Sequence, residues 1–202
     1  MKTALAFFGA FNPPTLAHLA AARAAAEQTG TEPVIFIPSR SVYIRGDQGK
    51  DKAWPDEARL AMLKKLSETR PWMAVSDIEL KQDRQPRSYD TLCRLREGGV
   101  RASLLMGSDK LRELERGWLH VEEIAREFGI VCVSRGEDDC AELLRQDPYL
   151  RALSPYIRLV TAPEEIRSVS STRARRLLAE NRDPAGLAAL LPEEILPLLK
   201  EG

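Results

Sequence analysis

The sequence has few of the residues from which metal clusters and disulfide frameworks are built. Its 202 residues include only two histidines, His18 and His120, which excludes a site made of several histidines. The cysteines (Cys93, Cys132 and Cys140) are odd in number and form no CxxC pair, which argues against a disulfide framework or a zinc cluster. We therefore expect no metal site built by the chain and a reducing, cytoplasmic location.

An excess of charge of one sign is also missing, as is any long hydrophobic run. Lys plus Arg equals Asp plus Glu at 30 each, so no overall positive field would hold nucleic acid or an acidic membrane. The apolar start MKTALAFFGAFNPP is too short to cross a bilayer and fits a buried first strand better than a signal peptide. Any phosphate binding must therefore be local.

The hydrophobic pattern predicts an α/β fold. Hydrophobic residues at 44% and charged residues at 30% are typical proportions of a folded domain. Short apolar runs alternate with longer amphipathic stretches, as in parallel strands joined by helical crossovers. Runs such as VIFI and GIVCV lack polar alternation, as expected for strands covered on both faces. We expect one domain over residues 1–202, with a small helical extension at 168–202.

The same pattern places the individual elements. Residues 39–54 are rich in glycine and charge and poor in periodicity, which predicts a mobile loop over one end of the sheet. Strands are predicted at residues 4–8, 34–37, 73–76, 102–106, 130–134 and 157–160, and helices at 15–28, 55–68, 88–96, 121–127 and 141–145, with two or three helical pieces after Ser170.

The segment GAFNPPTLAH joins the first predicted strand to the first predicted helix. Gly9 permits a close approach of a ligand or a tight turn, and free N–H groups at a helix start attract an anion such as phosphate. Thr15 and His18 are three residues apart, so both can face the same phosphoryl oxygens from the first helical turn. The alternative is that Asn12 or Thr15 caps the helix and His18 packs at the sheet edge.

The segment SVSSTRAR, residues 168–175, is a second candidate anion site. Ser170 and Ser171 suit a helix N-cap and first turn, and Arg175 would project from the helix that follows. The alternative is a capped surface helix with solvated arginines, a common arrangement in proteins. The two segments lie near opposite ends of the chain.

Both segments resemble motifs of one enzyme superfamily. GAFNPPTLAHL resembles the GxFxPxHxxH signature of the nucleotidyltransferases, and is most similar to the GxFxPxTxxH variant of eukaryotic-type nicotinamide mononucleotide adenylyltransferases. Thr15 stands where most bacterial members have the first histidine, while His18 keeps the second. SVSSTRAR resembles the (I/V)SSTxxR motif of the nicotinate/nicotinamide mononucleotide adenylyltransferases. The resemblance implies a Rossmann-like, doubly wound parallel sheet and one nucleotidyltransferase domain over residues 1–202.

The resemblance also implies a set of site residues. Residues 104–135 resemble the family pattern of a strand, a G(A/S)D turn, a tryptophan and a strand ending in arginine. Trp118 would stack on the pyridine ring, the alternative being a core aromatic, and Asp109 would approach a ribose, the alternative being a helix N-cap. The implied catalytic residues are His18, Thr15 and Arg175; the ATP site comprises Gly9, Ala10, Phe11, His18, Gly107, Asp109, Arg135, Ser170, Ser171, Arg175 and Arg45; the mononucleotide site comprises Asn12, Tyr43, Ser88, Tyr89, Thr91 and Trp118.

The implied reaction joins the adenylyl group of ATP, brought in with Mg²⁺, to nicotinate or nicotinamide mononucleotide and releases pyrophosphate. The sequence leaves open which mononucleotide is preferred, and it is compatible with a homo-oligomer. One alternative is another small nucleotidyltransferase, acting on phosphopantetheine, FMN or a choline-type phosphate. A second alternative is an ATP-binding module without catalysis, because Thr15 and residues 39–54 depart from the common family pattern.

Overall fold

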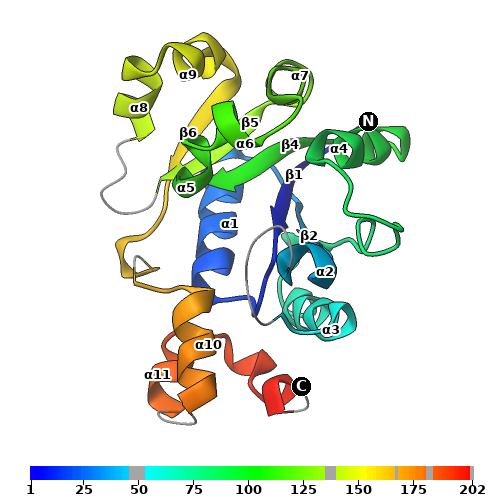
Figure 1. Cartoon of the computed structure of the whole chain (residues 1–202), viewed down its shortest axis with the longest axis vertical. Helices are drawn as coiled ribbons and strands as arrows, with labels where there is room; N and C mark the ends of the chain where they lie inside the picture. Colours follow the sequence, from blue (N-terminus) through cyan, green and yellow to red (C-terminus); the bar gives the residue numbers. More distant parts are fainter. Residues whose placement is uncertain (46–52, 135–139, 167, 181–183, 201–202) are drawn as a thin grey trace.

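The computed structural model of the chain describes residues 1–202 except 46–52, 135–139, 167, 181–183 and 201–202. Within these residues six strands form one parallel sheet at the centre of the molecule (Figure 1). The α/β fold and the six predicted strand positions are confirmed, with small changes at the ends. The strands are β1 (Lys2–Gly9), β2 (Val34–Pro38), β3 (Met73–Val75), β4 (Val100–Gly107), β5 (Ile130–Ser134) and β6 (Ile157–Thr161).

The strand order is β3-β2-β1-β4-β5-β6, and every neighbouring pair is parallel. The chain runs outward from β1 to β3, crosses to β4 on the other side of β1, and continues outward to β6. The direction of winding therefore reverses between β1 and β4, which end at Gly9 and Gly107. In open α/β sheets the crevice at such a reversal, outside the carboxyl ends of the strands, is where ligands bind.

Helices cover both faces of the sheet. Successive side chains of a strand point to opposite faces, and those of β1 are apolar on both. Leu5 and Phe7 of β1 pack in one apolar cluster with α1 (Leu16–Thr29) and α3 (Asp56–Ser67). Ala4 and Ala6 belong to the opposite cluster, with α4 (Ser88–Glu97), α7 (Val121–Glu127), α8 (Cys140–Gln146) and α9 (Pro148–Leu153). The sheet is doubly wound, as the resemblance implied.

Four helices lie where the sequence predicted none: α2 (Ser41–Arg45), α5 (Ser108–Leu111), α6 (Leu114–Gly117) and α9. The segment 39–54 contains α2, which is anchored by the fully buried Ile44 and begins where the Asp56 carboxylate accepts the Ser41 N–H at 2.7 Å. The prediction of a loop without secondary structure is therefore wrong for residues 41–45, while residues 46–52 lie outside the described part. Helix α9 begins at a cap residue that the sequence contains, because the Asp147 side chain accepts the Leu150 N–H at 3.0 Å.

The end of the chain forms a small helical unit against the start of α1. It comprises α10 (Ser171–Glu180), α11 (Pro184–Ala188) and the 3-10 turns η3 (Glu193–Ile195) and η4 (Pro197–Lys200). Ala17 of α1 packs with Val169, Ala174, Leu190 and Leu191 in one apolar cluster. Figure 1 shows α10 and α11 at the end of α1 that lies away from α8 and α9.

Two short helices, α5 (Ser108–Leu111) and α6 (Leu114–Gly117), follow β4 and lead toward α7. In the described part of the chain, no helix is both long enough and apolar enough to cross a membrane.

Candidate active site

The loop of residues 9–15 leaves the carboxyl end of β1 and turns on a buried aromatic ring. Phe11 has a positive φ of 43°, and its ring packs 5.5 Å from Phe7, 5.3 Å from Phe36 and 5.1 Å from His18. A Cβ atom on Gly9 would come within 3.0 Å of the Phe11 ring. A side chain at position 9 would therefore crowd the ring of Phe11, whose side chain is core.

Thr15 and His18 bond to each other at the start of α1. Thr15 is the N-cap, its backbone N–H donates to His18 Nδ1 at 3.0 Å, and its hydroxyl lies 2.8 Å from the same nitrogen. Because a backbone N–H can only donate, Nδ1 must be the acceptor, and the ring proton is on Nε2. His18 is thus held as an N–H donor by its own helix cap.

Thr15, the N-cap of α1, is fully buried, with 0% of its surface exposed. The predicted common face of Thr15 and His18 is confirmed, since the two side chains meet in the first turn. The capping alternative describes the observed Thr15 contacts, and a contact between its hydroxyl and phosphate stays a prediction. His18 is half-buried.

The second motif docks directly on the first. The Ser171 hydroxyl donates to the Pro13 carbonyl at 2.9 Å, and Arg175 Nη1 donates to the Asn12 carbonyl at 2.8 Å. Arg175 Nη2 also donates to the Thr172 hydroxyl at 3.1 Å. The fold thus brings together residues 158 and 163 positions apart in the chain.

This junction is electrostatically positive. Burial lowers the pKa of Arg175, but guanidinium remains protonated throughout the physiological range. Within the residues that the structure describes, no carboxylate forms an ion pair with Arg175. Ser170 caps α10, accepting the Arg173 N–H at 3.2 Å, so the amino end of a ten-residue helix adds its own partial positive charge. The arrangement suits an anion.

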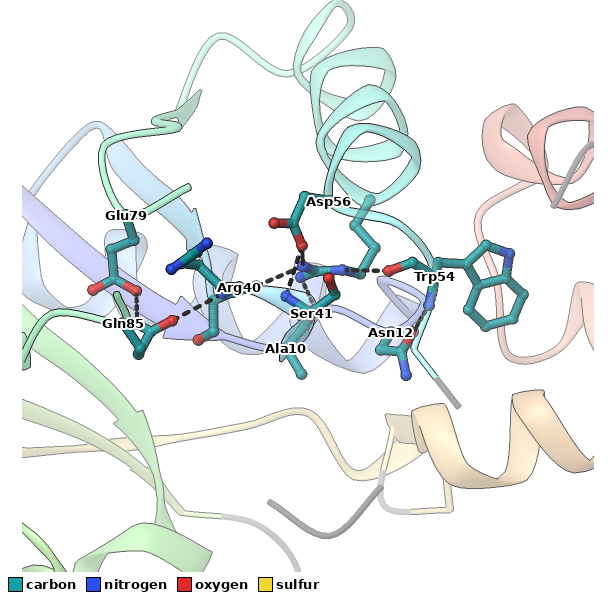
Figure 2. A network of polar contacts seen from close by, with 10 residues as sticks. Ala10, Asn12, Arg40, Ser41, Trp54, Asp56, Glu79 and Gln85 are labelled. Carbon is teal, nitrogen blue, oxygen red and sulfur yellow. Dashed lines mark hydrogen bonds and ion pairs between the residues drawn. The ribbon is translucent and has the colours of Figure 1, made fainter. Parts of the chain in front are cut away.

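Asn12 is buried in the same loop, with 1% of its surface exposed. Its side-chain oxygen accepts the Trp54 N–H at 2.9 Å (Figure 2). Its backbone carbonyl accepts from Arg175. Asn12 therefore has a structural task in addition to its predicted contact with the mononucleotide.

A residue that the sequence did not single out lies beside it. Arg59 of α3 is fully buried and donates to the Ala10 carbonyl at 2.7 Å. The spacing in the sequence could have indicated that Arg59 is buried. It lies three, four and seven residues before Met62, Leu63 and Leu66, and therefore on the same face of the helix. An arginine on an apolar helix face is unusual, since arginine is almost never fully buried unless it is paired.

Gly107 and Asp109 lie at the carboxyl end of β4, across the point of reversal from Gly9. Asp109 is exposed and is the second residue of α5, and the N-cap position belongs to Gly107 without a side-chain bond. The alternative that Asp109 is an ordinary N-cap is therefore wrong. Its predicted contact with a ribose stays a prediction.

Trp118 follows α6 and is half-buried against the core on the α4 and α7 face of the sheet. It lines a hollow of about 540 Å³ together with His120 and Tyr149. His18 and Arg175 are not among the residues that line this hollow. The position is compatible with both stacking and core packing, and stacking on a pyridine ring stays a prediction.

The three residues predicted at the start of α4 differ in their surroundings. Ser88 is the first residue of the helix. The hydroxyl of Tyr89 donates to Glu127 at 2.9 Å, a bond that raises the pKa of Tyr89 to about 12. Thr91 is buried and donates to Glu79 at 3.0 Å, so its hydroxyl is turned into the interior.

The remaining predicted residues are Tyr43 and Arg45, which follow β2, and Arg135, which follows β5. Tyr43 is half-buried on α2 and Arg45, its last residue, is exposed. Arg135 lies outside the described residues. Within the described part, no group of three or more His, Cys, Asp or Glu side chains is placed to hold a metal ion.

Comparison with known proteins gives one consistent family. The family model described as cytidylyltransferase-like matches residues 6–177. A protein of Neisseria meningitidis serogroup C / serotype 2a, named "Probable nicotinate-nucleotide adenylyltransferase", is 33% identical over 191 residues, covering 89% of this chain and 88% of its own. A protein of the same name from Caldicellulosiruptor saccharolyticus is 29% identical over 182 residues, covering 90% and 89%.

Solved structures agree on the fold. The nicotinic acid mononucleotide adenylyltransferase of Plasmodium falciparum, complexed with NaAD, superposes with a TM-score of 0.79 at 18% identity, covering 100% of this chain and 96% of that one. The same enzyme complexed with APC gives a TM-score of 0.78 at 17% identity.

Proposed function

The chain belongs to the cytidylyltransferase-like family and, within it, to the nicotinate-nucleotide adenylyltransferases, and we propose that it joins nicotinate mononucleotide to the adenylyl group of ATP. Adenylyl transfer to a pyridine mononucleotide is the reaction of the relatives by name. The choice of nicotinate over nicotinamide follows those names and is the finer part of the proposal.

One observation carries the proposal. Ser171 and Arg175 of the second motif bond to the carbonyls of Pro13 and Asn12 in the first. A cation, a helix amino end and the half-buried His18 are thus gathered outside the carboxyl end of β1, beside the point where the winding of the sheet reverses. Such a place suits the polyphosphate of a nucleotide.

The reaction is a substitution at phosphorus. An oxygen of the 5′-phosphate of the mononucleotide attacks the α-phosphorus of ATP and forms a new P–O bond. The bond from the α-phosphorus to the bridging oxygen breaks, and pyrophosphate leaves with the electron pair. No general base is needed, because the attacking phosphate is already anionic, and the protein contributes positioning and charge.

His18 donates from Nε2 to an oxygen on the α-phosphorus, since Nδ1 is committed to Thr15. Arg175 and the start of α10 hold the departing pyrophosphate. Thr15 acts through His18 by fixing its ring, in addition to any contact of its own. Gly107 and Asp109 border the same crevice from β4.

Mg²⁺ enters as part of the substrate, because it neutralises the triphosphate and is bound mainly by phosphate oxygens and water in nucleotide sites. The residues that we assign to the chain, His18 and Arg175, donate hydrogen bonds or positive charge. Because Ser171 and Arg175 bond to Pro13 and Asn12 in the loop of residues 9–15, we infer that residues 1–202 act as one nucleotidyltransferase domain.

The test is pyrophosphate release from MgATP with nicotinate mononucleotide, nicotinamide mononucleotide, phosphopantetheine and FMN in turn. We expect release with the pyridine nucleotides, fastest with the nicotinate form, and formation of the dinucleotide by mass. A folded protein that binds MgATP and is silent with both pyridine nucleotides would contradict the proposal.

A further inference from the structure

Arg59 is a permanently charged side chain with none of its surface exposed. It lies on the inward face of α3 among Met62, Leu63 and Leu66. A buried guanidinium is unfavourable unless its donors are satisfied and its charge is paired. Its partners therefore indicate why an arginine is present in this part of the core.

The guanidinium connects three separate segments of the chain, and Figure 2 labels its partners Ala10, Trp54 and Asp56. Nη1 donates to the Ala10 carbonyl at 2.7 Å, in the loop after β1. Nη2 donates to the Ser39 carbonyl at 2.5 Å, directly after β2, and to Asp56 at 2.6 Å. Nε donates to the Trp54 carbonyl at 3.2 Å, just before α3. One side chain thus fixes the ends of two neighbouring strands to each other.

A line of hydrogen bonds continues from Arg59 to the second motif. Trp54, whose carbonyl accepts from Arg59, donates its N–H to the Asn12 side chain at 2.9 Å. The carbonyl of Asn12 then accepts from Arg175. On the other side, the Asp56 oxygen bonded to Arg59 also accepts the Ser41 N–H at the start of α2.

We propose that Arg59 is a positioning residue for ATP, which holds Ala10, Trp54 and Asn12 so that the Asn12 carbonyl fixes Arg175 at the phosphate site. Arg59 itself touches no substrate. The inference rests on the proposed function for the role of Arg175, and extends it to a buried residue on a different helix.

Lysine is the informative replacement. It keeps the positive charge beside Asp56, but its single nitrogen cannot reach three carbonyls and a carboxylate that lie in different directions. Arg59→Lys therefore separates the loss of loop fixation from the loss of charge. Arg70→Lys is a matched control, because Arg70 follows the other end of α3 and donates to Leu66 and Glu194, away from the two motifs.

The experiment measures the Kd of MgATP alone by calorimetry, with the folded fraction of each variant checked by circular dichroism. We expect Arg59→Lys to raise the Kd about tenfold, the effect of losing one well-placed charge-assisted bond. Arg70→Lys should stay within about twofold of the parent, even where its melting temperature falls. An unchanged Kd in Arg59→Lys, or equal effects of both variants, would overturn the proposal.

A double variant tests the line to Arg175. If Arg59 acts through Arg175, the double replacement Arg59→Lys/Arg175→Lys raises the Kd by less than the product of the two single effects. A full product overturns the proposal. Should Arg59→Lys fail to fold, Asn12→Ala interrupts the same line and must itself weaken MgATP binding, and an unchanged Kd there overturns it too.

These measurements use MgATP without a second substrate, so they are independent of transfer. A protein that binds MgATP, responds to Arg59→Lys as expected and forms no dinucleotide would refute the proposed function and leave the role of Arg59 standing.

Discussion

The loop of residues 9–15 and the start of α10 meet at one point of the molecule, yet they are built in opposite ways. In the loop, Phe11, Asn12 and Thr15 have at most 1% of their surface exposed, and their polar groups are committed to other parts of the chain. At the start of α10, Ser170 and Arg173 are exposed, and Val169 and Ala174 provide the buried contacts.

The difference separates two tasks. The loop is fixed by internal hydrogen bonds before any nucleotide arrives, so its geometry depends on folding. The start of α10 keeps Ser170 and Arg173 exposed and Arg175 half-buried at its surface, so these groups can contact a ligand. We therefore expect substitutions in or behind the loop to change stability together with turnover, and substitutions at α10 to change nucleotide affinity with a smaller effect on stability.

The largest effect is expected for His18→Ala, which removes the N–H donor held by the loop. Turnover should fall about a hundredfold or more, because one lost donor to a transition state typically costs roughly 3 to 4 kcal/mol. Stopped-flow or steady-state assays with both substrates saturating measure it. A melted His18→Ala protein whose folded fraction keeps full activity would mean that His18 is only a core residue.

A second effect concerns the buried carboxyl of Glu79 and can be measured through its dependence on pH. Burial raises the pKa of Glu79 to about 7, above the usual 4.5, and its oxygens accept from Gln85 and Thr91. Gln85 in turn accepts the Arg40 N–H at 2.9 Å, which links Glu79 to the segment after β2 (Figure 2). Glu79 binds its proton more tightly in the folded state than in the unfolded state. Ionisation of Glu79 therefore lowers the free energy of unfolding.

The number of protons bound by the folded and unfolded states determines how the free energy of unfolding changes with pH. Below about pH 4.5 the carboxyl is protonated in both states, so it makes no pH-dependent contribution to the free energy of unfolding. Between about pH 4.5 and 7 only the unfolded state ionises, so that free energy falls as pH rises, and above pH 7 the loss is constant. The total loss is on the order of 3 kcal/mol, because each unit of pKa difference is worth about 1.4 kcal/mol.

Glu79→Gln should abolish this loss. The new amide oxygen can accept from Gln85 while its NH₂ donates to Thr91, so the contacts are kept without the charge. Urea unfolding at pH 5 and pH 8 measures the difference between parent and variant. We expect the variant to gain stability relative to the parent at pH 8, and an equal difference at both pH values would contradict the assignment.

At α10 the expected effect is smaller and of another kind. Arg175→Ala should raise the KM for ATP about tenfold to thirtyfold and leave the KM for the mononucleotide within about twofold, because one charged hydrogen bond to phosphate is worth roughly 1.5 to 2 kcal/mol. The melting temperature should fall less than for substitutions in the loop, although the Asn12 carbonyl loses one partner. Arg176→Ala, which removes an exposed pair with Glu180, is the control. Equal rises in both KM values would contradict a specific role on the ATP side.

The sequence predicted those parts of the molecule that depend on local pattern. All six strands follow from short apolar runs, and the common face of Thr15 and His18 follows from their spacing. Helix α2 could not be predicted, because the group that accepts its first N–H is Asp56, fifteen positions along the chain from Ser41. Such a contact exists only once α3 has packed.

The candidate site shows the same limit. Both motifs were visible as separate segments, but the bonds of Ser171 and Arg175 to the first loop span more than 150 positions and depend on the whole sheet. The position of Arg59 on the apolar face of α3 can be read from the sequence, but the three carbonyls that surround it cannot. The candidate residues could be identified from the sequence, whereas their long-range hydrogen-bond partners could not.

The smallest effect is expected for Thr15→Val, which keeps the branched shape and deletes the hydroxyl. Loss of a helix cap costs about 1 kcal/mol of stability, and the ring of His18 loses the oxygen 2.8 Å from Nδ1 but keeps the Thr15 N–H at 3.0 Å. We expect kcat to fall about threefold to tenfold. Thr15→Ser, which retains the hydroxyl, is the control and should stay close to the parent.

A double variant decides how Thr15 contributes. If its hydroxyl acts by holding His18, then Thr15→Val has no further effect on kcat in a His18→Ala background, because the ring that it positions is gone. If the hydroxyl contacts phosphate directly, the two losses multiply. The buried position of Thr15, with 0% of its surface exposed, favours the first outcome. Multiplied losses would show that the loop rearranges when ATP binds, and that it is less rigid than its internal bonds indicate.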